Sequence, residues 1–172
     1  MDLGLFLIRA VVGLLFVGHG TQKLFGWFDG HGMDGTAGFF ESLGYRNGRS
    51  HAQLAGASEA IGGALLFLGL LTPFGAAAII GVMLNAVGSV HIDNGVWNTE
   101  GGYEYNLVNG TVAAGLAFAG PGDFSFDNAL GLNLDGFLWG LVALALGGIT
   151  GFLVLSAREV PEEKEEEARR VA

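Results

Sequence analysis

The chain has 172 residues, of which 51% are hydrophobic and only 15% are charged, and its formal net charge is −9 at pH 7. So little charge excludes an ordinary soluble domain of this length, which needs a larger charged surface. Because the sequence has no cysteine and no basic patch, disulfides and thiolate metal sites are excluded and no nucleic-acid partner is expected.

The first apolar segment, residues 3–20, is close to the length of about 20 residues that a helix needs to span a bilayer. It has neither a basic start nor a small-residue cleavage site, so we expect a retained helix and not a signal peptide. At about 100° per residue, Arg9, Phe16, His19 and Lys23 fall on one face of this helix.

The loop that follows predicts a short interfacial helix at residues 36–43, with Thr36 as its N-cap and Gly44 as its stop. Aromatic side chains in a loop of this kind favour the membrane interface over free solvent. These aromatic residues are Phe25, Trp27, Phe28, Phe39 and Phe40.

Four further apolar segments follow, and we expect spans near residues 52–71, 74–92, 105–119 and 136–156. None alternates as barrel strands do, and only helices or closed barrels satisfy their backbone in lipid. The sequence therefore predicts an all-α integral membrane protein, a four-helix transmembrane bundle plus a fifth C-terminal transmembrane helix. Residues 1–157 would form the membrane domain and 158–172 an acidic solvated tail. Close helix contacts are expected at small residues: Gly13, Gly20, Gly56, Gly63, Gly81, Gly88, Gly110 and Gly147.

Charge outside the spans bears on setting and orientation. An acidic, lysine-poor surface suggests a protein that works in concentrated salt, and a halophilic archaeal origin is our hypothesis. Arginine and lysine gather in the first loop and the tail, which the positive-inside rule would place in the cytoplasm with the N-terminus outside.

The clearest functional signal is Glu59, which lies inside the second apolar segment. A charge at bilayer depth costs about 2.5–3.5 kcal/mol even on lenient scales, so it usually pairs, faces a cavity or does chemistry. Since consecutive spans run antiparallel, Glu59 is expected level with Phe16, facing His19 or Arg9. Glu59 and Arg9 are the candidate catalytic residues; alternatively, they only cross-link two helices.

Other polar residues converge on the same half of the bundle. The third span carries Asn85 and His91, and the fourth begins with Tyr103, Glu104 and Asn106. We expect a cavity near the first loop, lined by His19, Glu59, His91 and Tyr103. The candidate ligand-binding residues are His19, His91, Tyr103, Lys23, Asn85, Glu104 and Asn106. The asparagines can instead serve as interhelical hydrogen bonds. His19 and His91 can be read as a haem or metal pair, but no ligand spacing supports this, and no metal is predicted.

With these residues in place, the chain resembles the DoxX family of small membrane proteins. The matching motifs run in order over roughly residues 5–127: LIRAVVGLLFVGHGTQKLFGW, GTAGFFESLG, LAGASEAIGGALLFLGLLTPFGA, VHIDNG, GGYEYNLV and AGPGDFSFD. The resemblance implies a four-helix bundle associated with redox chemistry. Relatives include the membrane part of a thiosulfate:quinone oxidoreductase, and the family is similar to MauE-type proteins linked to disulfide formation. It also implies an N-terminus inside, opposite to the charge rule, so orientation stays open. By position, the family's polar pattern falls on Arg9, His19, Lys23, Glu59, His91 and Glu104.

Three functions follow as expectations. The first is a quinone-linked oxidoreductase subunit of the cell membrane that passes electrons from a small sulfur donor such as thiosulfate to a bound quinone. A protein partner carrying a redox centre is then expected, and homo-oligomers are possible. The second is a non-catalytic anchor or accessory subunit of a larger redox or respiratory complex. A solute or proton pathway through Glu59 and Arg9 ranks below both, because the broken helices and repeats of transporters are not visible.

Overall fold

The structure, a computed structural model, describes residues 2–159, so most of the predicted acidic tail lies outside the described residues. Apart from one isolated antiparallel bridge between Tyr45 and Arg158, regular structure in this range is helical, which confirms the all-α prediction. The α-helices are α1 (Asp2–Phe25), α2 (Gly32–Ser42), α3 (Gly48–Leu68), α4 (Thr72–Ala86), α5 (Glu104–Ala119), α6 (Phe126–Ala129) and α7 (Phe137–Leu155). After α4 the chain continues through a π-helical turn, Val87–His91, and two 3₁₀ turns, Ile92–Asn94 and Asn98–Glu100.

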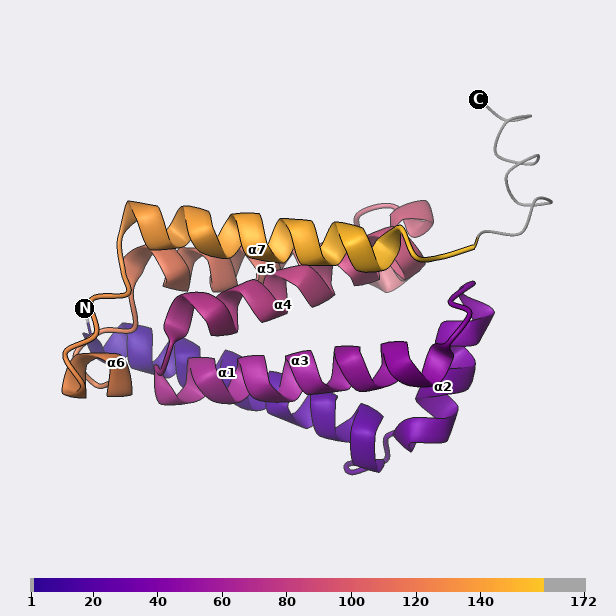
Figure 1. Ribbon diagram of the computed structural model, residues 1–172, viewed down its shortest axis with the longest axis horizontal. Coiled ribbons are helices and arrows are strands. Elements are labelled where there is room, and N and C mark those ends of the chain that lie inside the picture. Colours follow the sequence, from indigo (N-terminus) through magenta and orange to yellow (C-terminus); the bar gives the residue numbers. More distant parts are fainter. Residues whose placement is uncertain (1, 160–172) are drawn as a thin grey trace.

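The helices form two layers (Figure 1). One layer holds α1 and α3, with α2 lying across its end, and the other holds α4, α5 and α7. The layers are joined where α3 turns directly into α4. Near that turn the backbones approach closely, since a Cβ on Gly62 would lie 3.2 Å from the Gly75 carbonyl oxygen.

Glycine contacts hold each layer together, as the sequence predicted. A Cβ on Gly20 of α1 would lie 2.5 Å from the Gly56 carbonyl oxygen of α3, and Gly13 meets Gly63 in the same way. In the other layer, a Cβ on Gly147 of α7 would lie 2.7 Å from the Cβ of Ile80. Such small residues allow the close backbone packing that membrane helices use.

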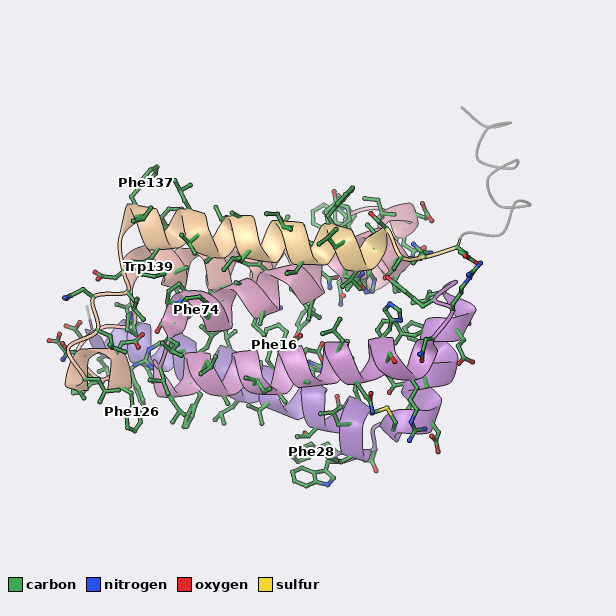
Figure 2. The ribbon with its side chains drawn as sticks, in the orientation of Figure 1. Phe16, Phe28, Phe74, Phe126, Phe137 and Trp139 are labelled. Carbon is green, nitrogen blue, oxygen red and sulfur yellow. The ribbon has the colours of Figure 1, made fainter. Side chains whose placement is uncertain are left out.

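Three helical stretches within the described residues are long and apolar enough to cross a membrane: Asp2–Phe25, Thr72–Asn94 and Phe137–Leu155. Their outward side chains are apolar and exposed; Phe137, for example, points away from the bundle, as does Phe28 beyond the end of α1 (Figure 2). These faces suit a lipid environment, and the chain is a helical membrane protein. With 16 residues, α5 is about 24 Å long, shorter than a hydrocarbon core of about 30 Å.

Two predicted boundaries are corrected. The interfacial helix α2 starts at Gly32, four residues before Thr36, so Thr36 is not an N-cap; its hydroxyl donates to the Lys23 carbonyl at 3.4 Å. Helix α1 runs to Phe25 and stops at Gly26, whose φ of 72° only glycine adopts readily. Lys23 therefore lies on the last turn of the spanning helix.

Candidate functional site

Glu59 forms an ion pair with Lys23 inside the bundle. The Lys23 ammonium nitrogen lies 2.6 Å from Oε2 of Glu59, and the two side chains are 29% and 5% exposed. Apart from this ion pair, Oε2 has no hydrogen-bond partner among the described residues. The close contact of Gly20 with Gly56 brings α1 and α3 near enough for the pair to form.

His19 connects the two layers. Its Nδ1 lies 3.2 Å from Oε1 of Gln22, and its Nε2 lies 3.2 Å from the hydroxyl oxygen of Tyr105 at the start of α5. The His19 ring also meets Phe16 edge-on, with 6.2 Å between centroids. Tyr105 was not among the predicted site residues, although it lies one turn before Asn109 on a polar helix face.

A cavity of about 690 Å³ lies between the two layers, in the half of the bundle nearest α2. Its polar lining includes the Glu59–Lys23 pair and His19, so the structure brings together residues from α1, α3, α4 and α5, as expected. Six of the predicted site residues line it: His19, Lys23, Glu59, Asn85, His91 and Asn106. Apolar and aromatic side chains make up most of the remaining wall.

The buried asparagines have partners within the protein. Asn85 donates to the hydroxyl of Tyr45 at 2.8 Å, which ties α4 to the turn between α2 and α3. Asn106 faces the sulfur of Met83 at 3.6 Å, so its amide has only a weak acceptor. The Asn85 contact therefore joins a helix to a turn and not to another helix, whereas Asn106 keeps hydrogen-bonding capacity toward the cavity.

His91 stands at the rim of the cavity, at the end of the π-helical turn. Its Nδ1 lies 2.7 Å from the Gly101 carbonyl oxygen. A π-helical turn widens the helix by one residue and is frequent at functional sites. Here it ends at the predicted ligand residue.

Tyr103 and Glu104 do not line the cavity, and this corrects the predicted lining. Tyr103 is the N-cap residue of α5, one position before the helical turn that faces the cavity. Glu104 accepts a hydrogen bond from the Asn98 backbone N–H at 3.1 Å and thereby orders the connection before α5. Their position makes them part of the loop and not of the cavity wall.

Arg9 does not pair with Glu59, contrary to expectation. It is fully buried at the opposite end of α1, where its guanidinium donates to the carbonyl oxygens of Leu66 at 3.3 Å, Phe67 at 3.1 Å and Phe124 at 2.5 Å. The first two carbonyls belong to the last turn of α3, where a cation also balances the helix dipole. Arg9 is outside the cavity lining.

Asp127, the last residue of the AGPGDFSFD motif, completes this second buried charged site, although it was not among the predicted site residues. Its carboxylate accepts from the backbone N–H of Leu71 at 2.7 Å, the N–H of Thr72 at 3.0 Å and the Thr72 hydroxyl at 2.8 Å. It therefore caps the N-terminus of α4 and also attracts the Arg9 guanidinium.

Within residues 2–159, no three histidine, aspartate or glutamate side chains come together in a way that could hold a metal ion. His19 already has a neighbour at each ring nitrogen. The arrangement offers hydrogen bonds and a carboxylate to an organic ligand.

Comparisons with known proteins agree with the motifs. The family model described as DoxX matches residues 4–92. A protein of Bacillus subtilis (strain 168) named "Putative oxidoreductase CatD" is 35% identical over 91 residues, which cover 52% of this chain and 58% of that protein. The match thus spans little more than half of that relative. No solved structure matches the chain significantly.

Proposed function

The chain belongs to the DoxX family, and from that premise we propose that it binds a membrane quinone in the cavity beside Glu59 and serves as the quinone-handling subunit of an oxidoreductase. The observation that carries the proposal is a buried carboxylate on the wall of an otherwise largely apolar cavity. The name of the Bacillus relative supports oxidoreductase chemistry in general terms.

The cavity fits the chemistry of a quinone. A quinone ring is flat, neutral and apolar at its edges, with two carbonyl oxygens that accept hydrogen bonds. The polar end of the cavity offers His19, Lys23 and Asn106 as donors, while apolar side chains cover the rest. When bound, the quinone takes up two electrons and two protons.

In this proposal the protein's own residues hold the ring and deliver protons. To donate to a ring oxygen, His19 exchanges its contact with Gln22 or Tyr105 for the ligand, and His91 donates through Nε2 as an imidazolium, because its Nδ1 already donates to the Gly101 carbonyl. Glu59 can exchange a proton with the ligand because its carboxylate lines the cavity and is held there by the Lys23 ammonium. Lys23 is the more exposed member of the pair, so it connects Glu59 with the loop side of the bundle.

Electrons come from outside this chain. With no cysteine and no gathered metal ligands in residues 2–159, the first electron step fits a partner subunit with its own redox centre. A small sulfur donor such as thiosulfate is the proposed source. In this setting the chain is a multi-pass protein of the cell membrane, with α3 and α5 crossing beside α1, α4 and α7.

The alternative is a non-catalytic anchor or accessory subunit of a redox or respiratory complex. One observation favours it: Glu59 already has a charged partner, so the polar cluster can be explained without a ligand. The acidic composition separately supports a halophilic origin. If the solubilised protein stayed folded equally well without high salt, that origin would be rejected.

Quinone binding to the purified protein in lipid nanodiscs separates the two functions. We expect ubiquinone or menaquinone analogues to bind, and His19→Ala or His91→Ala to weaken binding roughly three- to tenfold, the worth of one hydrogen bond. Glu59→Gln should slow thiosulfate-dependent quinone reduction in native membranes more than it weakens binding. Arg49→Ala, which removes an exposed ion pair with Asp34, is the matched control. Equal binding by all variants would leave only the accessory role.

A further inference from the structure

Two helices of different layers, α3 and α7, border the cavity (Figure 1). Leu54 and Ser58 of α3 line one side, and Leu146 and Thr150 of α7 line the other. Helix α7 packs mainly on α4 and α5, and near the α2 end its Val154 also packs on the cluster of Ala37, Phe40, Tyr45 and Ala52. Leu54 and Leu146 are 51% and 40% exposed. We call this boundary, formed by Leu54, Ser58, Leu146 and Thr150, the lateral seam.

At the α2 end, a strap from the end of α7 crosses between the layers. Arg158 donates through Nε to the Leu43 carbonyl at 2.8 Å and through a terminal nitrogen to the Gly88 carbonyl at 3.1 Å. The next residue, Glu159, donates its backbone N–H to the Gly44 carbonyl at 2.8 Å. This strap joins the α2–α3 turn, the π-helical turn and α7 above the cavity.

At the other end the layers converge. Gly62 and Gly75 bring α3 and α4 of the two layers into close contact. The seam is thus bounded above and below. Between these ends the exposed leucines of the seam, Leu54 and Leu146, border the cavity.

The lining of the cavity has a polar part and an apolar part. The Glu59–Lys23 pair and His19 belong to the polar part, where the formal charges of the pair cancel. Leucines flank the opening. A negatively charged lipid headgroup would be repelled by the Glu59 carboxylate, because Lys23 is already paired with it. A neutral ring with a hydrocarbon tail suits both the polar part of the cavity and the leucines of the seam. A volume of about 690 Å³ holds such a ring with the first part of its tail.

We propose that the lateral seam between α3 and α7 is the route by which a neutral, ring-headed, lipid-soluble ligand enters the cavity from the bilayer, and the groove that holds its tail. The identity of the head group rests on the proposed function. The ligand arrives through lipid and leaves through lipid, without passing the strap.

The absence of native cysteine allows a direct test by cross-linking. Leu54→Cys with Thr150→Cys places one thiol on each side of the seam, and a bifunctional maleimide joins them in nanodiscs. The matched control is the same variant labelled with N-ethylmaleimide, which adds bulk without a bridge. The probe is decyl-tailed ubiquinone, and its amount in washed protein is measured by mass spectrometry. A second variant, Leu54→Trp, narrows the seam without a cross-link.

We expect cross-linking before probe addition to slow association at least about tenfold, and cross-linking afterwards to retain the probe through washing that empties the control. Leu54→Trp should slow association in the same direction. Equal association and release in bridged and control protein, with quinone still bound, would overturn the seam and leave the proposed function standing. No binding in the unmodified protein would reject both. Cross-links between two copies of the chain would show that a second copy occupies the seam and would overturn the proposal. A phospholipid bound at the seam that quinone cannot displace would overturn it as well.

Discussion

Arg9 and Glu59 are both charged residues buried in apolar helices, yet their surroundings differ. Arg9 is enclosed at the α3–α4 end, where it donates three hydrogen bonds to backbone carbonyls and lies near Asp127. Glu59, at the opposite end of the bundle, has one ion pair with Lys23 and borders a large cavity. The guanidinium of Arg9 is thus hydrogen-bonded to backbone carbonyls, whereas the carboxylate of Glu59 lies beside a cavity that a ligand can fill.

The surroundings of a charged residue within a membrane helix indicate whether it serves the fold or a ligand. A buried charge that satisfies helix ends is part of the fold, because its removal leaves backbone groups without partners. A buried charge with one flexible partner and an adjacent cavity can be changed with little harm to the fold. We therefore expect stability effects to concentrate around Arg9 and ligand effects around Glu59.

Arg9→Met is expected to have the largest effect on stability. It removes the three hydrogen bonds to α3 and Phe124 and the electrostatic attraction between Arg9 and Asp127. Losing one partner of a buried charged site costs about 3–5 kcal/mol. Thermal unfolding in detergent measures the loss. Arg9→Lys should restore little, because an ammonium group cannot reproduce the planar fork of the guanidinium.

An exposed charge provides the control for that measurement. Arg49→Met breaks a surface ion pair with Asp34 and should change stability by less than about 1 kcal/mol. If Arg9→Met unfolded at the wild-type temperature, the structural role of Arg9 would have to be abandoned.

Asp127→Ala is expected to be the next largest change. The carboxylate accepts two backbone N–H groups at the start of α4 and the Thr72 hydroxyl. Loss of an N-cap costs roughly 0.5–2 kcal/mol, and the buried position favours the upper end. Asp127→Asn, which keeps one acceptor oxygen, should lose less. Equal melting temperatures for Asp127→Ala and wild type would contradict the capping role.

Double-mutant cycles should separate the two sites. The changes Lys23→Met and Glu59→Gln are expected to couple by about 1 kcal/mol, because the two groups touch. Arg9→Met and Glu59→Gln should add within about 0.5 kcal/mol, because they share no partner. If the coupling energy between Arg9 and Glu59 were as large as that between Lys23 and Glu59, Arg9 would be the partner of Glu59, as the sequence predicted.

Glu59→Gln alone is expected to have the smallest effect on stability, below about 1 kcal/mol. The amide keeps the size of the carboxyl group, and Lys23, which is partly exposed, can turn its ammonium group toward water. Chemical unfolding of the reconstituted protein checks this. A loss as large as that of Arg9→Met would make Glu59 a residue of the fold.

Much of the bundle could be predicted from the sequence, including the helical class and the face of α1 that carries Arg9, Phe16 and His19. The correct partner of Glu59 could also have been found. Helical side chains lean toward the N-terminus of their own helix. In antiparallel α1 and α3, Lys23 and Glu59 therefore lean toward each other, whereas Arg9 and Glu59 lean apart.

The other hydrogen-bond partners of the buried polar residues could not be predicted, because they lie in the turns and connections between the spanning helices. Arg9 reaches the Phe124 carbonyl, and Asp127 caps α4 from a connection whose path no periodic pattern defines. Likewise Tyr45, which accepts a hydrogen bond from Asn85, lies in a turn. The size of the cavity depends on the distance between the α1–α3 layer and the α4–α5–α7 layer. The spacing of apolar residues along each helix does not determine that distance.

Photolabelling with an azido-quinone in nanodiscs, followed by peptide mapping, tests whether a quinone occupies the cavity beside Glu59. We expect label on the cavity walls that excess unlabelled quinone removes: in α3 between residues 51 and 59, and in α4 and the following π-helical turn between residues 77 and 91. Arg9→Met protein that remains folded should label the same peptides. Displaceable label around Arg9 and Asp127, or label that unlabelled quinone does not displace, would contradict it.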